Sequence, residues 1–195
     1  MQPFSKPARE WEEKAQGLRQ MVGCDPGANL DPWSLAPLVG LKVLDGNTAL
    51  AMLGTNDRLH LQGPGKDSWS GGIYPYPLPD GNLLCILNPT HPYRRKKATL
   101  MEEIAHRHLG HEPTKLSTSS STLLSVRSFN ADIEKEAFGV GAAALAPWSR
   151  LFRLIDSGQS SRSIAETLDV TPELINYRIN ITGAHRLYSA RQRTA

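Results

Sequence analysis

The chain has 195 residues, of which 39% are hydrophobic and 21% charged, and its formal net charge is +3 at pH 7. These values fit a soluble globular protein with one domain, or one domain with a small appendage. No apolar run approaches the roughly 20 residues of a membrane-spanning helix, and the charged start, MQPFSKPAREWEEKAQ, lacks the apolar segment of a secretory signal. Two distant cysteines, Cys24 and Cys85, form no disulfide framework or zinc-finger spacing, so we expect reduced thiols and a cytoplasmic protein.

Hydrophobic spacing and turn residues predict the elements of the first half. The segment 8–22 has its apolar residues on one helical stripe. A short helix within 31–40 and a strand within 41–46 are expected to follow. The stretch WSGGIYPYPLPDGNLLCILNPT, residues 69–90, predicts a β-hairpin, because its Asp-Gly pair suits a tight turn and NLLCILN is typical of a buried strand.

The second half is predicted to be mostly helical. TLMEEIAHRHLGH, residues 99–111, predicts a helix that starts near Thr99 and stops at Gly110. A polar loop, EPTKLSTSSST, separates it from a second long helix at about 130–145, and short helices follow. We therefore expect a domain spanning 1–147 and a C-terminal helical segment, 148–195, packed on it.

The helix that starts near Thr99 carries an altered zinc motif. Metallopeptidase helices contain H-E-x-x-H, in which the histidines bind zinc and the glutamate activates water. Here Glu103 and His106 are in place, but Glu102 replaces the first histidine. Residues four apart share a helix face, so Glu102 and His106 point the same way and Glu103 lies beside them. The same residues also suit an ordinary charged surface, because E-x-x-x-H is common in helices.

A further metal ligand would have to come from another helix. The second long helix offers Glu134 and Glu136, and His108 and His111 are alternatives close to the motif. A site of Glu102, His106 and Glu134 would have two carboxylates and one imidazole. This harder ligand set makes manganese or iron plausible beside zinc. The extra negative charge would also weaken the activation of water near neutral pH.

The C-terminal stretch SIAETLDVTPELINYRI, residues 163–179, has the spacing of a helix-turn-helix. We expect a core of Ile164, Ala165, Leu168, Val170 and Ile175. Glu173 at the start of the second helix opposes a phosphate backbone, so a structural pair of helices is favoured over a DNA reader. The basic clusters at 93–97 and 186–193 are expected to be solvated surface, with nucleic acid or an acidic partner as the alternative.

The order of these elements resembles the ImmA/IrrE family of metallo-endopeptidases. The active helix of this family usually reads T-L-x-H-E-x-x-H, and its second helix reads E-x-x-A-x-x-F-A-x-x-L-L-x-P. Glu134, Ala137, Leu145 and Pro147 fall on the second pattern, while Val140 and Gly141 replace Phe-Ala and Ala144 replaces Leu. Together with WSGGI, the strand ending in ILN and YRRKKATL, the resemblance covers roughly residues 8–183.

The resemblance implies a small zincin-like α+β fold with a short antiparallel sheet, an active-site helix and a C-terminal helix-turn-helix-like segment. It implies that His106 and Glu134 bind the metal, that Glu103 is the general base, and that Glu102 occupies the place of the first ligand. Family members commonly cleave or antagonise a helix-turn-helix repressor, so a transcriptional repressor is the expected substrate. The alternative is a non-catalytic regulator that keeps the fold and binds a protein partner or DNA.

Overall fold

The structure, a computed structural model, describes residues 2–44, 46–51, 54–74, 76–111 and 131–193. Its class is α+β, as predicted: mostly helical, with a small three-stranded sheet. Up to the sheet, the described elements are α1 Lys6–Met21, α2 Pro32–Leu35, the 3-10 helix η1 Ala36–Val39, β1 Leu41–Leu44, α3 Gly46–Ala51, α4 Thr55–Gln62, β2 Gly71–Ile73 and β3 Leu83–Leu87. Beyond it they are α5 Tyr93–His108, α6 Ala131–Leu145, α7 Trp148–Asp156, α8 Ser161–Leu168, α9 Pro172–Ile181 and α10 His185–Gln192.

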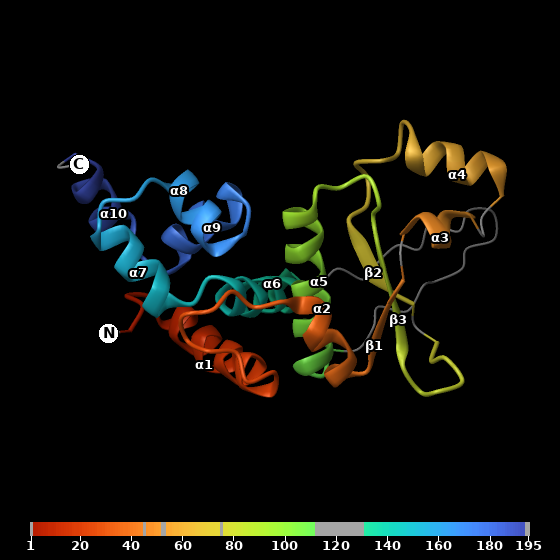
Figure 1. Cartoon of the computed structure of the whole chain (residues 1–195), viewed down its shortest axis with the longest axis horizontal. Helices are drawn as coiled ribbons and strands as arrows, with labels where there is room; N and C mark the ends of the chain where they lie inside the picture. The colour runs from red at the N-terminus through yellow and green to blue at the C-terminus, as the bar shows by residue number, and fades with distance from the viewer. Residues whose placement is uncertain (1, 45, 52–53, 75, 112–130, 194–195) are drawn as a thin grey trace.

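The described elements form an elongated arrangement (Figure 1). The sheet, α3 and α4 lie at one end, α7 to α10 lie at the other, and α1, α5 and α6 occupy the middle. Among the described helices, none is long and apolar enough to cross a membrane. The predicted polar loop EPTKLSTSSST falls outside the described residues.

The sheet has the strand order β1-β3-β2. β2 and β3 pair antiparallel, as predicted for the hairpin, and Gly81 in their connection has a φ of 82°. The sheet is not wholly antiparallel, however, because β1 pairs parallel with β3. This expectation was wrong because α3, α4 and β2 lie between the two strands in sequence, and a connection of that length permits a parallel pairing.

Helix α5 starts six residues earlier than the capping signal predicts, at Tyr93, so Thr99 is a buried interior residue. The early turns carry the basic cluster that was expected to be solvated. Lys97 is only 3% exposed and its ammonium donates to a carboxylate oxygen of Asp169 at 2.9 Å. Arg94 donates to the other oxygen at 3.0 Å. The start of α5 is thus held by tertiary contacts to the turn between α8 and α9.

The helix-turn-helix-like core is confirmed. All five residues that were predicted to form it are buried: Ile164, Ala165, Leu168, Val170 and Ile175. The hydroxyl of Thr171 caps α9 by accepting from the Leu174 backbone amide at 3.3 Å. In α9, Arg178 is fully buried, donates to the Ala146 carbonyl at 3.1 Å and pairs with Glu12 of α1. These contacts join the C-terminal helices to the middle of the molecule.

Small residues let α6 lie close to helices on two sides. A Cβ atom placed on Gly139 would come within 2.3 Å of the Trp11 ring on α1. A Cβ atom placed on Gly141 would come within 3.0 Å of the Met101 carbonyl oxygen on α5. Both helices therefore approach α6 more closely than larger side chains would allow.

We expect Gly139→Ala to destabilise the fold by about 1–3 kcal/mol, because the new methyl group overpacks the buried Trp11 ring. Gly17→Ala on α1 is the matched control, since its Cβ would meet nothing closer than 3.9 Å. That variant should gain up to about 1 kcal/mol from helix propensity. Urea denaturation measures both, and equal shifts in the two variants would contradict this account of the packing.

We expect Asp169→Asn to destabilise the protein at neutral pH, because it leaves the Lys97 ammonium buried without a counter-charge. Asparagine tolerates the left-handed backbone at this position, where φ is 52°. Burial raises the pKa of Asp169, but hydrogen bonds from Lys97 and Arg94 outweigh it, and the net pKa is lowered. The ion pair between Asp169 and Lys97 therefore stabilises the fold at pH values above the ordinary aspartate pKa. This stabilisation is lost as the pH falls through the lowered pKa that Asp169 has in the folded protein.

The measurement is the free energy of unfolding of wild type and Asp169→Asn as a function of pH. The difference should be largest near neutral pH and should vanish in acid. In the double variant with Lys97→Met, where no buried charge remains, most of the loss should be recovered. If the difference in unfolding free energy between wild type and Asp169→Asn did not change with pH, the ion pair would not be the cause of the destabilisation.

Candidate metal site

Two helices supply the side chains of the site. Glu102 and His106 are one turn apart on α5, so both face α6. Glu134 lies in the first turn of α6 and reaches toward them. The close approach of the two helices near Gly141 and Met101 brings these faces together.

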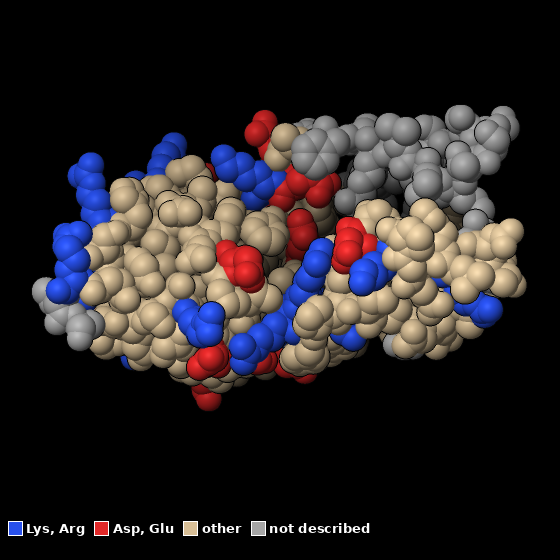
Figure 2. Space-filling view, turned by 90° about the horizontal axis from the view of Figure 1, so that it is seen from above, with Lys and Arg blue, Asp and Glu red and all other residues tan. Residues whose placement is uncertain are grey.

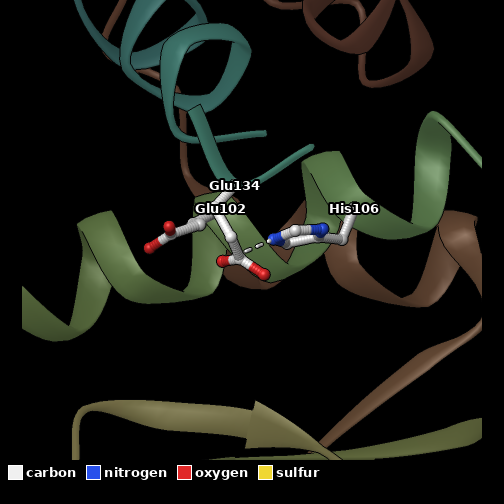
Figure 3. A group of neighbouring side chains, drawn as sticks. All are labelled: Glu102, His106 and Glu134. Atoms are coloured by element: carbon white, nitrogen blue, oxygen red, sulfur yellow. Dashed lines mark ion pairs between the residues drawn. The ribbon is translucent and has the colours of Figure 1, made fainter. Parts of the chain in front are cut away.

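The three residues converge. The Nε2 atom of His106 lies 3.5 Å from a carboxylate oxygen of Glu134 (Figure 3). With one donor atom taken from each residue, the atoms of Glu102, His106 and Glu134 all lie within 4.8 Å of one another. The side chains of His106 and Glu134 are 16% and 21% exposed, so the group is half-buried and still open to solvent.

This donor set fits a divalent metal ion. Ligand atoms about 2.1 Å from a tetrahedral metal are roughly 3.4 Å apart. The separation between His106 and Glu134 already matches that value, and modest side-chain rotation would bring Glu102 into range. Imidazole nitrogen and carboxylate oxygen are ligands accepted by zinc, manganese and iron. As a ligand set for a metal, these three residues remain a prediction.

Glu103 faces elsewhere on α5. Consecutive residues are about 100° apart around a helix, so its carboxylate is turned away from that of Glu102. The side chain is largely buried and lies toward β3, where burial and, secondarily, the Glu103 charge raise the pKa of the Cys85 thiol. The structure thus places Glu103 on the side of α5 toward the sheet and does not bring its carboxylate into the group formed by Glu102, His106 and Glu134. Its role as general base remains a prediction.

The second nitrogen of His106 has its own partner. His106 Nδ1 lies 3.1 Å from Nδ1 of His111, and His111 Nε2 lies 3.3 Å from a carboxylate oxygen of Glu136. Glu136 also accepts from Lys14 of α1, whose hydrogen bond is the main reason that its pKa is lowered. Of the two glutamates that α6 offers, Glu134 therefore faces His106 directly, and Glu136 faces His111.

The two histidines considered as alternative ligands differ in environment. His108 is exposed on the side of α5 that faces Gly17 of α1. His111 lies past the end of α5, as predicted, but Gly110 reverses the chain with a φ of 71° and returns its ring to His106. Sequence spacing contained only a weak signal for this contact, namely a glycine one residue before a histidine.

Acidic side chains gather near the middle of the face seen in Figure 2, at the position along the molecule where α5 lies in Figure 1. Basic side chains flank them. The carboxylates of Glu102 and Glu134, which belong to the candidate site, would attract a cation to it.

A family model of the IrrE N-terminal-like domain, peptidase family M78, matches residues 69–180. The chain belongs to this family. The match runs from β2 into α9 and includes every residue of the candidate site. Membership of this IrrE-like family implies a metallopeptidase-like function, a metal ion and a protein substrate. None of the curated proteins compared with the chain matches it.

We expect Glu102→His to strengthen zinc binding by this IrrE-like protein, because it restores the nitrogen ligand of H-E-x-x-H. Glu166→His, which adds a histidine on the exposed face of α8, is the control. Titration of the three proteins with zinc against a chromophoric chelator measures the affinity. Equal or weaker binding by Glu102→His would show that residue 102 does not contact the metal.

Proposed function

We propose that the protein is a metal-dependent endopeptidase that holds its metal with Glu102, His106 and Glu134 and uses Glu103 as general base. One observation carries the proposal: three donor atoms from two helices converge within 4.8 Å, inside the segment matched by a metallopeptidase family. The spacing of Glu103 and His106, which follows the family's zinc motif, supports the assignment of their roles.

A divalent metal bound there would act as a Lewis acid toward the scissile peptide carbonyl. Glu103 would accept a proton from the attacking water and deliver it to the leaving amine nitrogen. Its largely buried position suits a base whose carboxylate must keep one orientation. Two carboxylate ligands should reduce the effective charge of the metal, so we expect slow turnover, with manganese or iron as alternatives to zinc.

We further propose that the substrate is a helix-turn-helix transcriptional repressor. The support is the resemblance to the ImmA/IrrE family, whose members commonly act on such proteins. The test is incubation of the metal-loaded protein with purified helix-turn-helix repressors, followed by mass spectrometry of the products.

A second candidate function is a non-catalytic regulator. Glu102 favours it, because the residue that departs from the family pattern stands at a proposed ligand position. In this case the protein would bind a partner protein without cleaving it. DNA is a less favoured partner, because in α9 Arg178 is fully buried and Tyr177 packs edge-on against Phe138 with ring centroids 4.7 Å apart.

We expect Glu103→Gln to abolish proteolysis while leaving zinc affinity nearly unchanged. Glutamine has the same shape but cannot accept the proton, and general acid–base catalysis contributes about 10²–10⁴-fold to rate. The measurement is repressor cleavage by wild type and variant at equal metal occupancy, checked by elemental analysis.

Glu166→Gln on the exposed face of α8 is the matched control and should cleave like wild type. If Glu103→Gln cleaves equally well, the base lies elsewhere. If wild type binds metal and repressor but cleaves nothing, the non-catalytic function replaces the proteolytic one.

A further inference from the structure

The His106 ring is held on both of its nitrogens. Nε2 faces the Glu134 carboxylate at 3.5 Å, and Nδ1 faces Nδ1 of His111 at 3.1 Å. A contact between two ring nitrogens needs one N–H donor and one lone pair. The position of a single hydrogen therefore decides which atom of His106 can bind a metal.

The contact between His111 and Glu136 determines where this hydrogen lies. A carboxylate only accepts, so the His111 Nε2 atom, 3.3 Å from Glu136, carries the hydrogen. In neutral His111 the Nδ1 atom is then the acceptor. His106 must donate from Nδ1, which leaves its Nε2 lone pair directed toward Glu134 and Glu102. A lone pair facing two carboxylates is unfavourable unless a cation lies between them.

We propose that His111 is a positioning residue of the metal site: it accepts the Nδ1–H of His106 and so presents Nε2 of His106 to the metal. The inference rests on the proposed function and deepens it. Glu136 orients His111, and Lys14 of α1 orients Glu136 through an ion pair. Residues that hold a ligating histidine in this way typically change metal affinity by 10–100-fold when they are replaced.

The local backbone keeps His111 in place. Gly110 adopts a left-handed conformation with a φ of 71°, and the His111 amide donates to the His106 carbonyl at 3.0 Å. The His111 side chain is 11% exposed, less than that of His106. The contact is therefore a built feature at the end of α5, made by groups from α1, α5 and α6.

The first test compares zinc affinity among His111→Ala, His111→Asn and wild type. We expect His111→Ala to bind about 10–100-fold more weakly. In His111→Asn the amide oxygen occupies nearly the place of the lost Nδ1 and still accepts from His106, so affinity should largely recover. His108→Ala, which removes an exposed histidine from the end of the same helix, is the matched control and should bind like wild type.

The second test uses ¹⁵N NMR of the imidazoles in metal-free protein at about pH 8, above the ordinary histidine pKa of about 6.5. We expect a hydrogen on Nδ1 of His106 and on Nε2 of His111, with Nδ1 of His106 losing its hydrogen in His111→Ala. Finding Nδ1 of the wild-type His106 without a hydrogen would overturn the proposal. Loss of zinc in both His111→Ala and His111→Asn would also overturn it, because it would make His111 a ligand.

The proposed metal-dependent function and the proposed role of His111 can be refuted separately. If the wild-type protein binds no zinc, manganese or iron, the proposed function fails. The NMR result then decides the hydrogen-bonded arrangement alone, since it needs no metal. If the wild type binds zinc and His111→Ala binds equally tightly, the metal site stands and the role of His111 is refuted.

Discussion

The close packing of α6 against its neighbours is the constraint on which the site depends. Gly141 brings α6 against the backbone of α5 at Met101, one residue before Glu102. Gly139 leaves room on the other side of α6 for the side-chain ring of Trp11 from α1. At this separation a carboxylate oxygen of Glu134 lies 3.5 Å from Nε2 of His106. Residues without functional groups therefore set the distance at which the functional groups meet.

Part of the site could be predicted from the sequence alone. Glu102 and His106 share a face because any two helical residues four apart do so, and this needs no tertiary information. The choice of Glu134 over Glu136 came from the family resemblance, and the structure places Glu134 next to His106. The helix end at Gly110 was predicted, but the contact of His111 with His106 was not, since it also depends on a carboxylate from α6 that holds the His111 ring.

The fold shows the same division between local and tertiary signals. The hairpin and the buried residues of the C-terminal helices followed from periodicity and turn residues, whereas the α+β class was implied by the family resemblance. The start of α5 could not be predicted in this way. In the sequence, Lys97 and Arg94 look like a solvated basic cluster, and only the structure shows that both pair with Asp169, more than 70 residues later. The parallel pairing of β1 with β3 was missed for a related reason: strand direction depends on the path of the whole connection.

The pairing of Lys97 with Asp169 has a consequence for how the protein can be divided. Residues on both sides of position 147 contribute to one hydrophobic core, and Lys97 is compensated by the turn between α8 and α9. A fragment ending at residue 147 would keep Glu102, His106 and Glu134 but would lose the partner of a buried ammonium and the helices that cover its core. The C-terminal helices therefore complete the core around the part of the chain that carries the candidate site, and we expect that part to be unstable without them.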